Sequence, residues 1–326
     1  MPAPARLQNF TLQAPKELNG SVSDRVNEAI MKGMALNYRF RPQSVQEWLD
    51  LLGASPIPPT QPVISRLNTS TSWECAHIIP GHSQRVNSVA ISSNGQILAS
   101  GGWDSTIKLW SVTTGKEIRT LTGHSHMINS VAISSDWQIL ASGCWDSTIK
   151  LWSVTTGRVI RTLTGHFERV NSVVINSDGQ ILASGGWDKT IKLWSIVTGK
   201  EICTLTGHSQ IVNSVVISSD GQILASGSED KTIKLWSIAT GKEICTLTGH
   251  SQIVNSVVIS SDGQILASGS EDKTIKLWSI ATGKEICTLS HFDSVTSLAF
   301  TPDGDWLAAG DKNGNIKIWR SQLIVE

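Results

Sequence analysis

Residues 207–247 read GHSQIVNSVVISSDGQILASGSEDKTIKLWSIATGKEICTL, and the same line returns without a change over residues 249–289. Four looser copies follow the same pattern, and their first residues are Gly81, Gly123, Gly165 and Ser290. The starts are separated by 42 residues, with one spacing of 41. A period of about 40–45 residues is typical of the blades of a β-propeller, so we expect six blades.

Composition limits the classes of function. Lys+Arg and Asp+Glu number 27 each, so no excess positive charge favours binding to nucleic acid or to an anionic membrane. No window approaches the roughly 18 apolar residues of a membrane span, and we expect a soluble, cytoplasmic protein. Three of the five cysteines, Cys203, Cys245 and Cys287, occupy one repeat position and therefore fall on different blades. We expect reduced thiols, with no metal site and no cofactor.

The repeats cover residues 73–319 and leave an N-terminal piece over. Val26, Ile30 and Met34 recur at helical spacing, and Ser44 with Glu47 forms a capping-box pattern before a second apolar stripe. We therefore expect a short α-helical appendage over residues 1–53. Residues 54–72 are rich in proline, which favours an extended linker. The propeller domain is predicted over residues 73–326.

One stretch of this appendage, residues 29–53, reads AIMKGMALNYRFRPQSVQEWLDLLG. With Arg41-Pro42 before the final helix, the segment 5–53 resembles the C-terminal end of a bacterial serine/threonine protein kinase domain. The glycine-rich loop, the ATP lysine, the HRD loop and the DFG metal site of that family have no counterpart in this chain. The resemblance therefore implies no phosphate transfer, and the alternative is a plain amphipathic pair of helices.

Each repeat contains four short runs of β-type residues, separated by turn signals such as Asn94-Gly95 and Thr114-Gly115. In the first copy these runs are residues 86–91, 97–100, 106–110 and 117–121. Four such strands form one blade, and neighbouring blades bury both of its faces. The expected fold is therefore all-β, with a ring of blades around a channel.

A Gly-His pair opens each of the first five repeats and a tryptophan stands near the end of all six, which resembles the WD-repeat β-propeller family. That family commonly has Trp-Asp at the repeat end, whereas this chain has Trp-Ser five times and Trp319-Arg320 once. The resemblance implies a six-bladed WD-repeat propeller. Closing the ring requires a fourth strand for the last blade. We expect residues 75–79 to supply it, with residues 323–325 as the competing segment.

Each of the first five repeats places a histidine, a serine, an aspartate and a tryptophan at fixed offsets. A hydrolase triad needs one activated serine in one cleft, whereas this set recurs on five blades, so we expect no catalysis. The family resemblance implies a buried hydrogen-bonded tetrad instead. The sixth repeat has Ala309 and Asn313 in place of serine and aspartate, and we expect this blade to fray first. The five sets are His82, Ser100, Asp104, Trp110; His124, Ser142, Asp146, Trp152; His166, Ser184, Asp188, Trp194; His208, Ser226, Asp230, Trp236; and His250, Ser268, Asp272, Trp278.

The residue before the turn aspartate differs most among the repeats: it is tryptophan in repeats one to three, glutamate in repeats four and five, and Lys312 in repeat six. In the WD-repeat family this position, and those three and five residues after the histidine, face the narrow end of the propeller, which commonly meets partners. The resemblance thus implies a partner face made by Trp103, Trp145, Trp187, Arg85, Met127, Arg169, Glu229 and Glu271.

Tryptophan and arginine are enriched at the energetic centres of interfaces, which favours a protein or peptide partner. The alternative is that the three tryptophans merely cover loops on their own blades. The five-residue offset gives a ring that we expect to be solvated, namely Asn87, Asn129, Asn171, Asn213, Asn255 and Thr296. The sequence therefore predicts a non-catalytic protein-interaction scaffold that binds on its narrow face. The alternative is the sensory or scaffolding C-terminal half of a serine/threonine protein kinase whose catalytic region is missing from this chain.

Overall fold

The computed structural model describes residues 75–321 of the 326-residue chain. The chain divides into two compact units, Met1–Glu74 and Cys75–Glu326. The predicted helical appendage, its kinase-like stretch and the proline-rich linker lie outside the described residues.

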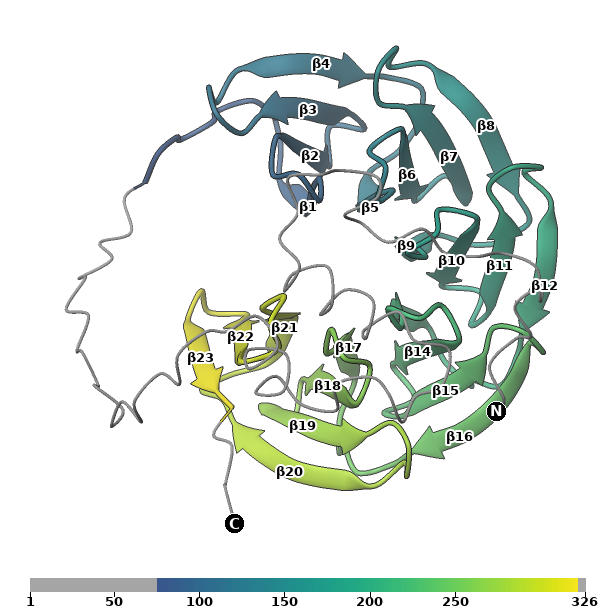
Figure 1. Ribbon diagram of the computed structural model, residues 1–326, viewed down its shortest axis with the longest axis vertical. Coiled ribbons are helices and arrows are strands. Elements are labelled where there is room, and N and C mark those ends of the chain that lie inside the picture. The colour runs from purple at the N-terminus through teal and green to yellow at the C-terminus, as the bar shows by residue number, and fades with distance from the viewer. Residues whose placement is uncertain (1–74, 322–326) are drawn as a thin grey trace, which may run out of the picture. The chain divides into compact units, whose positions relative to one another are not determined.

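The described part of the second unit, residues 75–321, is all-β, with 23 strands in six antiparallel sheets arranged as the blades of a propeller (Figure 1). Within each sheet the strands follow chain order from the channel to the rim, as β1 (Val86–Ile91), β2 (Ile97–Gly102), β3 (Ile107–Ser111) and β4 (Glu117–Leu121) do in blade 1. The six-bladed propeller is therefore confirmed, and the predicted strands of the first repeat end within two residues of the observed ones.

The other blades repeat this arrangement. Blades 2 and 3 contain β5 (Ile128–Ile133), β6 (Ile139–Cys144), β7 (Thr148–Ser153), β8 (Val159–Thr164), β9 (Val170–Ile175), β10 (Ile181–Gly186), β11 (Ile191–Ser195) and β12 (Glu201–Leu205). Blades 4 and 5 contain β13 (Val212–Ile217), β14 (Ile223–Ser228), β15 (Ile233–Ser237), β16 (Lys242–Leu247), β17 (Val254–Ile259), β18 (Ile265–Ser270), β19 (Thr274–Ser279) and β20 (Glu285–Ser290). Blade 6 contains β21 (Val295–Phe300), β22 (Trp306–Asp311) and β23 (Ile316–Arg320).

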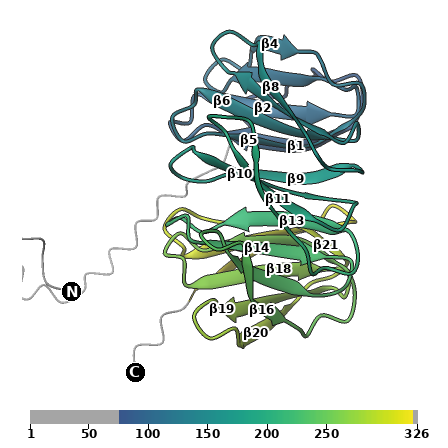
Figure 2. The same ribbon diagram turned by 90° about the vertical axis from the view of Figure 1, so that its right-hand side faces the viewer.

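Figure 2 shows the strands running between the two faces of the ring, so the turns that join them lie on those faces. The turn between the first two strands of a blade needs a residue in the left-handed region, and Gly179 supplies it in blade 3 with φ of 72°. Blade 2 has Trp137 at the matching place, with φ of 57°. Its indole N–H donates to Ser93 Oγ on blade 1 over 2.7 Å, which ties the two turns together.

Neighbouring blades pack through one repeated contact. Val170 and Val173 of β9 in blade 3 press on Gly143 of β6 in blade 2, where an added Cβ would lie 2.8 Å from Val170. A side chain at this glycine would push the blades apart, so glycine is required there. Both valines are buried, and they belong to a cluster of core residues that spans blades 2 and 3.

The ring does not close as expected. In the described part of the chain the sheet of blade 6 has three strands, β21, β22 and β23, and residues 75–79 form no strand. The prediction that residues 75–79 pair with blade 6 is therefore wrong for this structure. The segment lies against blade 1 instead, where His77 Nε2 is 3.1 Å from the carbonyl oxygen of Thr113. The competing residues 323–325 lie outside the described residues.

Candidate functional site

The tetrad residues of each of the first five blades come together in the structure. In blade 4, His208 Nδ1 lies 2.7 Å from the Asp230 carboxylate, and His208 Nε2 lies 2.8 Å from Ser226 Oγ. The indole N–H of Trp236 donates to the same Ser226 oxygen over 2.9 Å. Ser226 is completely buried, so its hydroxyl cannot reach a substrate. The network therefore fixes the strands and loops of a blade, and it is not arranged as an accessible catalytic triad.

The aspartate of each tetrad also holds the local turn. Asp230 accepts from the backbone N–H and the hydroxyl of Thr232, and from the backbone N–H of Ser209. Burial alone would raise the pKa of such a carboxyl group, but the hydrogen bonds from histidine, threonine and backbone outweigh it. They lower the pKa of Asp104 and of Asp188 from 3.8 to about 2. These carboxylates are thus charged at neutral pH, whereas burial lowers the pKa of His250 and favours its neutral ring.

Blade 6 builds its network differently from the sequence prediction. Asn313, which occupies the aspartate position, donates to Asp293 and leaves the histidine to another group. His291 Nδ1 lies 3.3 Å from the carboxylate of Asp311, two residues earlier in the chain. Because Ala309 replaces the serine, His291 Nε2 is buried with no hydrogen-bond partner. Nδ1 also accepts the backbone N–H of Phe292 over 3.0 Å, so Asp311 lies beside the ring without a hydrogen bond to it. The serine hydroxyl of the tetrad is missing in this blade.

Blade 2 brings a thiol beside its tetrad. Cys144 Sγ, His124 and Asp146 place their donor atoms within 4.8 Å of one another, a spacing that a metal ion could bridge. Each atom already has a hydrogen-bond partner, however, since the thiol donates to the His126 carbonyl oxygen and the histidine bonds to Asp146 and to Ser142. Burial raises the pKa of the Cys144 thiol to about 12, which disfavours the thiolate that a metal would need. The cluster thus fits a structural network better than a metal centre.

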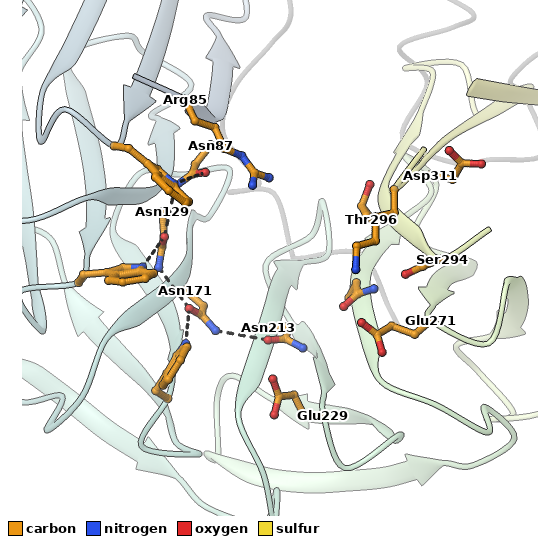
Figure 3. A pocket seen from close by; sticks show the side chains of 15 residues that line it. Arg85, Asn87, Asn129, Asn171, Asn213, Glu229, Glu271, Ser294, Thr296 and Asp311 are labelled. Atoms are coloured by element: carbon orange, nitrogen blue, oxygen red, sulfur yellow. Dashed lines mark hydrogen bonds between the residues drawn. The ribbon is translucent and has the colours of Figure 1, made fainter. Parts of the chain in front are cut away.

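A cavity of about 870 Å³ opens at one end of the channel, where the turns between the second and third strands of the blades meet (Figure 3). Six of the eight predicted partner-binding residues line it. Met127 and Arg169 are not among the lining residues, although Met127 accepts the backbone N–H of Trp145 through its carbonyl oxygen. The lining residues are Arg85, Asn87, Trp103, Asn129, Trp145, Asn171, Trp187, Asn213, Glu229, Asn255, Glu271, Ser294, Thr296, Asp311 and Lys312.

The aromatic half of the cavity is held by cation–π contacts and hydrogen bonds. The Arg169 guanidinium carbon lies 3.7 Å from the ring centroid of Trp145 and 4.3 Å from that of Trp187, so it contacts both indoles, whose centroids are 6.3 Å apart at an interplanar angle of 51°. The Trp187 indole N–H donates to Asn171 Oδ1 over 2.9 Å, and 37% of this residue is exposed. The tryptophans thus pack within the propeller in part, and Trp187 still presents a surface to solvent.

The asparagine ring is more than a solvated lining. Asn129 accepts the indole N–H of Trp145 over 2.7 Å and donates to the carbonyl oxygen of Val170 on the next blade over 3.1 Å. The same bridge to the next blade recurs from Asn87 through Asn255. The expectation of a merely solvated ring is therefore corrected, because these side chains join adjacent blades. The repetition of asparagine at one offset was the signal for this role.

The opposite half of the cavity is acidic. Glu229 and Glu271 extend from adjacent blades toward the channel (Figure 3). Burial, together with the nearby negative charge of Glu271, raises the pKa of Glu229 above its usual value. A carboxylate whose charge is disfavoured in this way gains when a positive group approaches it. Lys312 and Asp311 complete this side of the cavity.

Comparison with protein families agrees with this geometry. The family described as "WD domain, G-beta repeat" matches residues 73–111, 115–153, 157–195, 199–237, 241–279 and 283–320. The chain belongs to the WD-repeat family. WD-repeat propellers typically act as protein-interaction scaffolds. Among residues 75–321 no helix is long and apolar enough to span a membrane.

The WD-repeat chain is also similar over short stretches to curated proteins. It is 38% identical to Protein Mut11 of Chlamydomonas reinhardtii over 53 residues, which are 16% of this chain and 14% of that protein. It is 40% identical over 62 residues to the "Probable E3 ubiquitin ligase complex SCF subunit sconB" of Arthroderma benhamiae, covering 18% of this chain and 9% of that protein. The matched stretches span well under two thirds of these relatives.

Proposed function

We propose that this WD-repeat propeller is a non-catalytic scaffold that binds a protein or peptide at the cavity mouth on its narrow face. The observation that carries the proposal is the division of one cavity into an aromatic half and an acidic half. Trp103, Trp145 and Trp187 offer flat apolar surface, and Arg169 holds two of them in place. Rigid aromatic groups beside an arginine are the usual centres of binding energy at interfaces.

Charge limits what the partner presents to this site. Glu229 and Glu271 favour a positive side chain, whereas Arg85 on the far side of the cavity favours a carboxylate or a carbonyl oxygen. A protein segment that carries both kinds of group satisfies both halves, whereas nucleic acid would meet the two glutamates with its phosphates. The proposed partner is therefore a protein or peptide segment. The kinase-linked alternative rests on residues 5–53, outside the described residues, and stays a prediction.

The test uses Trp187→Ala and Trp145→Ala in the full chain, with Trp137→Gly as the matched control. Trp137 is 38% exposed, close to the 37% of Trp187, but it lies at the opposite end of β6 from the Trp145 turn. Loss of a central interface tryptophan costs about 2 kcal/mol or more, which is about thirtyfold in affinity. We expect Trp187→Ala and Trp145→Ala to weaken partner binding by that factor, while Trp137→Gly leaves it unchanged.

Binding is measured by affinity capture from lysate, followed by titration of each captured protein against the purified variants. Circular dichroism shows whether each variant keeps the fold. Partners that bind the two cavity variants as tightly as the unchanged chain would contradict the proposed site. Glu229→Gln provides a second measurement, since it should weaken a partner that presents a positive side chain.

A further inference from the structure

The five contacts between neighbouring blades also share two hydrogen bonds. In each, an asparagine of one blade donates to a backbone carbonyl oxygen of the next, as Asn255 does to Val295 over 2.9 Å. A serine of the same blade as the asparagine also accepts a backbone N–H from the next blade, as Ser256 of blade 5 does from Leu298 of blade 6 over 3.2 Å. Together with the valine-to-glycine packing, these bonds define what a complete contact between blades looks like.

Blade 1 leaves exposed the side of this contact that supplies the apolar side chains of the inner strand. Val89 is 62% exposed, whereas the matching Val131 of blade 2 is 6% exposed. Val86 is 43% exposed, whereas the matching Ile128 is fully buried. The inner strand of blade 1 thus carries an apolar face that every later blade buries. Leaving apolar side chains in water is unfavourable by about 25 cal/mol per Å².

Blade 6 presents the other half uncovered. Ile316 and Ile318 are 72% and 64% exposed, whereas the matching Ile107 and Leu109 of blade 1 are each 1% exposed. Gly310 occupies the place at which other blades receive valines, and no atom lies within 4 Å of a Cβ built there. Figure 1 shows blades 1 and 6 standing apart while the other neighbours adjoin.

The hydrogen-bond ladder ends at the same place. Thr296 replaces the asparagine in blade 6, and its hydroxyl donates to the carbonyl oxygen of Gly310 within its own blade over 3.2 Å. Blade 6 therefore lacks the side chain that would reach blade 1. Four separate features, namely the two bare faces, the empty position at Gly310 and the altered ladder, mark one open space between blades 6 and 1.

Residues 75–79 show what belongs in this space. His77 contacts the carbonyl oxygen of Thr113 on blade 1. In the same way Arg161, on the outer strand β8 of blade 2, contacts the carbonyl oxygen of Val197 on blade 3. Residues 75–79 thus take the place of the outer strand of a blade that precedes blade 1. Strand β23, in turn, has no outer partner among the described strands. The missing unit is an outer strand followed by three inner ones, which is the unit of residues 241–279.

We propose that the space between blades 1 and 6 is a docking slot for one further WD-type blade, supplied by a partner polypeptide. The slot has two walls, blade 1 and blade 6, and its occupant must contact both of them. A second copy of this chain could insert only its own blade 1 or its own blade 6. Each of these has one free face, so the second copy would make only one of the two contacts. A partner blade with glycine toward blade 1 and valines toward blade 6 completes both contacts. This proposal is independent of the site at the cavity mouth.

Disulfide formation between two engineered cysteines tests whether blades 1 and 6 lie apart. In the complete blades the positions that match Ile318 and His77 lie opposite each other, as Leu193 and Cys203 do. We therefore combine His77→Cys with Ile318→Cys in a Cys75→Ser background. The six-repeat chain should form no disulfide within one molecule under mild oxidation. The same chain with one extra copy of residues 207–248 inserted after residue 248 should form it, because seven blades bring the two positions together.

Two results of this experiment would overturn the proposal. A disulfide within the six-repeat chain would mean that the ring closes on itself. A seven-repeat chain that fails to cross-link would mean that the space does not fit one blade. Disulfide-linked dimers would assign the slot to a second copy, which also overturns the proposed occupant.

Binding of a blade in trans is tested with a fluorescent polypeptide of residues 241–279. The full chain should bind it saturably at one to one, and Val89→Asp should weaken binding at least about tenfold, because a carboxylate would be buried in the slot. Ile202→Asp is the matched control, since Ile202 is 52% exposed on an outer strand away from the slot. Equal binding by both variants, or no binding by the unchanged chain, would overturn the proposal.

Discussion

Replacing Ala309 by serine should stabilise the propeller, because blade 6 buries an imidazole nitrogen that has nothing to bond with. In the other blades a serine at this position bonds to the histidine over 2.7–2.8 Å and accepts from the tryptophan over 2.8–2.9 Å. Ala309 pairs with Lys317 across the sheet, as Ser226 pairs with Lys234, so the new hydroxyl should occupy the same place.

The size of the effect follows from the unpaired group. A buried polar atom without a partner costs about 1–3 kcal/mol, and part of any gain offsets the cost of ordering the new hydroxyl. We expect Ala309→Ser to add about 1 kcal/mol to the free energy of unfolding, or about 2–4 °C in Tm for a domain of this size. The reverse change, Ser226→Ala, leaves the Trp236 N–H and the His208 nitrogen both unpaired and should cost about 2–4 kcal/mol.

Thermal and urea unfolding of the full chain measure both variants. Ala308→Ser is the matched control, because it adds a hydroxyl to the neighbouring position of β22, whose side chain points to the other face of the sheet. It should bring no stabilisation. An Ala309→Ser chain that is no more stable than the unchanged one, while Ser226→Ala costs under about 0.5 kcal/mol, would refute the structural role assigned to the tetrads.

Two further predictions concern pH and local stability. Because hydrogen bonds lower the pKa of Asp104 from 3.8 to about 2, their contribution is complete above pH 3.8 and is lost as the pH falls toward 2. Thermal unfolding from pH 6 to pH 2.5 should show that loss, and Asp104→Asn should reduce it by the share of one tetrad, because the aspartates of the other tetrads titrate in the same range. Hydrogen exchange should be fastest in blade 6, and greater protection of residues 294–319 than of residues 212–237 would contradict this order.

The regular part of this structure could be predicted from the sequence. Strand positions and the five tetrads repeat at every copy, so each blade supplies the same evidence again. The exceptions could not be predicted in this way. Asp311, two residues before Asn313, is the carboxylate that lies beside His291, and a comparison by offset does not reveal this shift. The open ring depends on how six blades share the angle around the channel, which no single repeat contains.

The cavity mouth lies between these cases. Trp187, Glu229 and Lys312 occupy the position at which the repeats differ most, and all three line the cavity, whereas the binding of a partner there stays a prediction. The contact of Arg169 with the indoles of Trp145 and Trp187 could not be predicted, because Arg169 and Trp145 come from adjacent blades and from different repeats. Contacts across blades depend on the geometry of the ring, which the spacing within a repeat does not describe.

The uniform contact between blades has a consequence for how such a gene changes. Blades 4 and 5 derive from one identical line of sequence, and they meet through the same valines, glycine, asparagine and serine as their neighbours do. Slippage between identical segments during replication adds or removes a whole unit at once. Every new junction then has the same contact of valines, glycine, asparagine and serine that joins the other blades. A change of this kind would alter the number of blades while each junction between neighbours keeps the same packing.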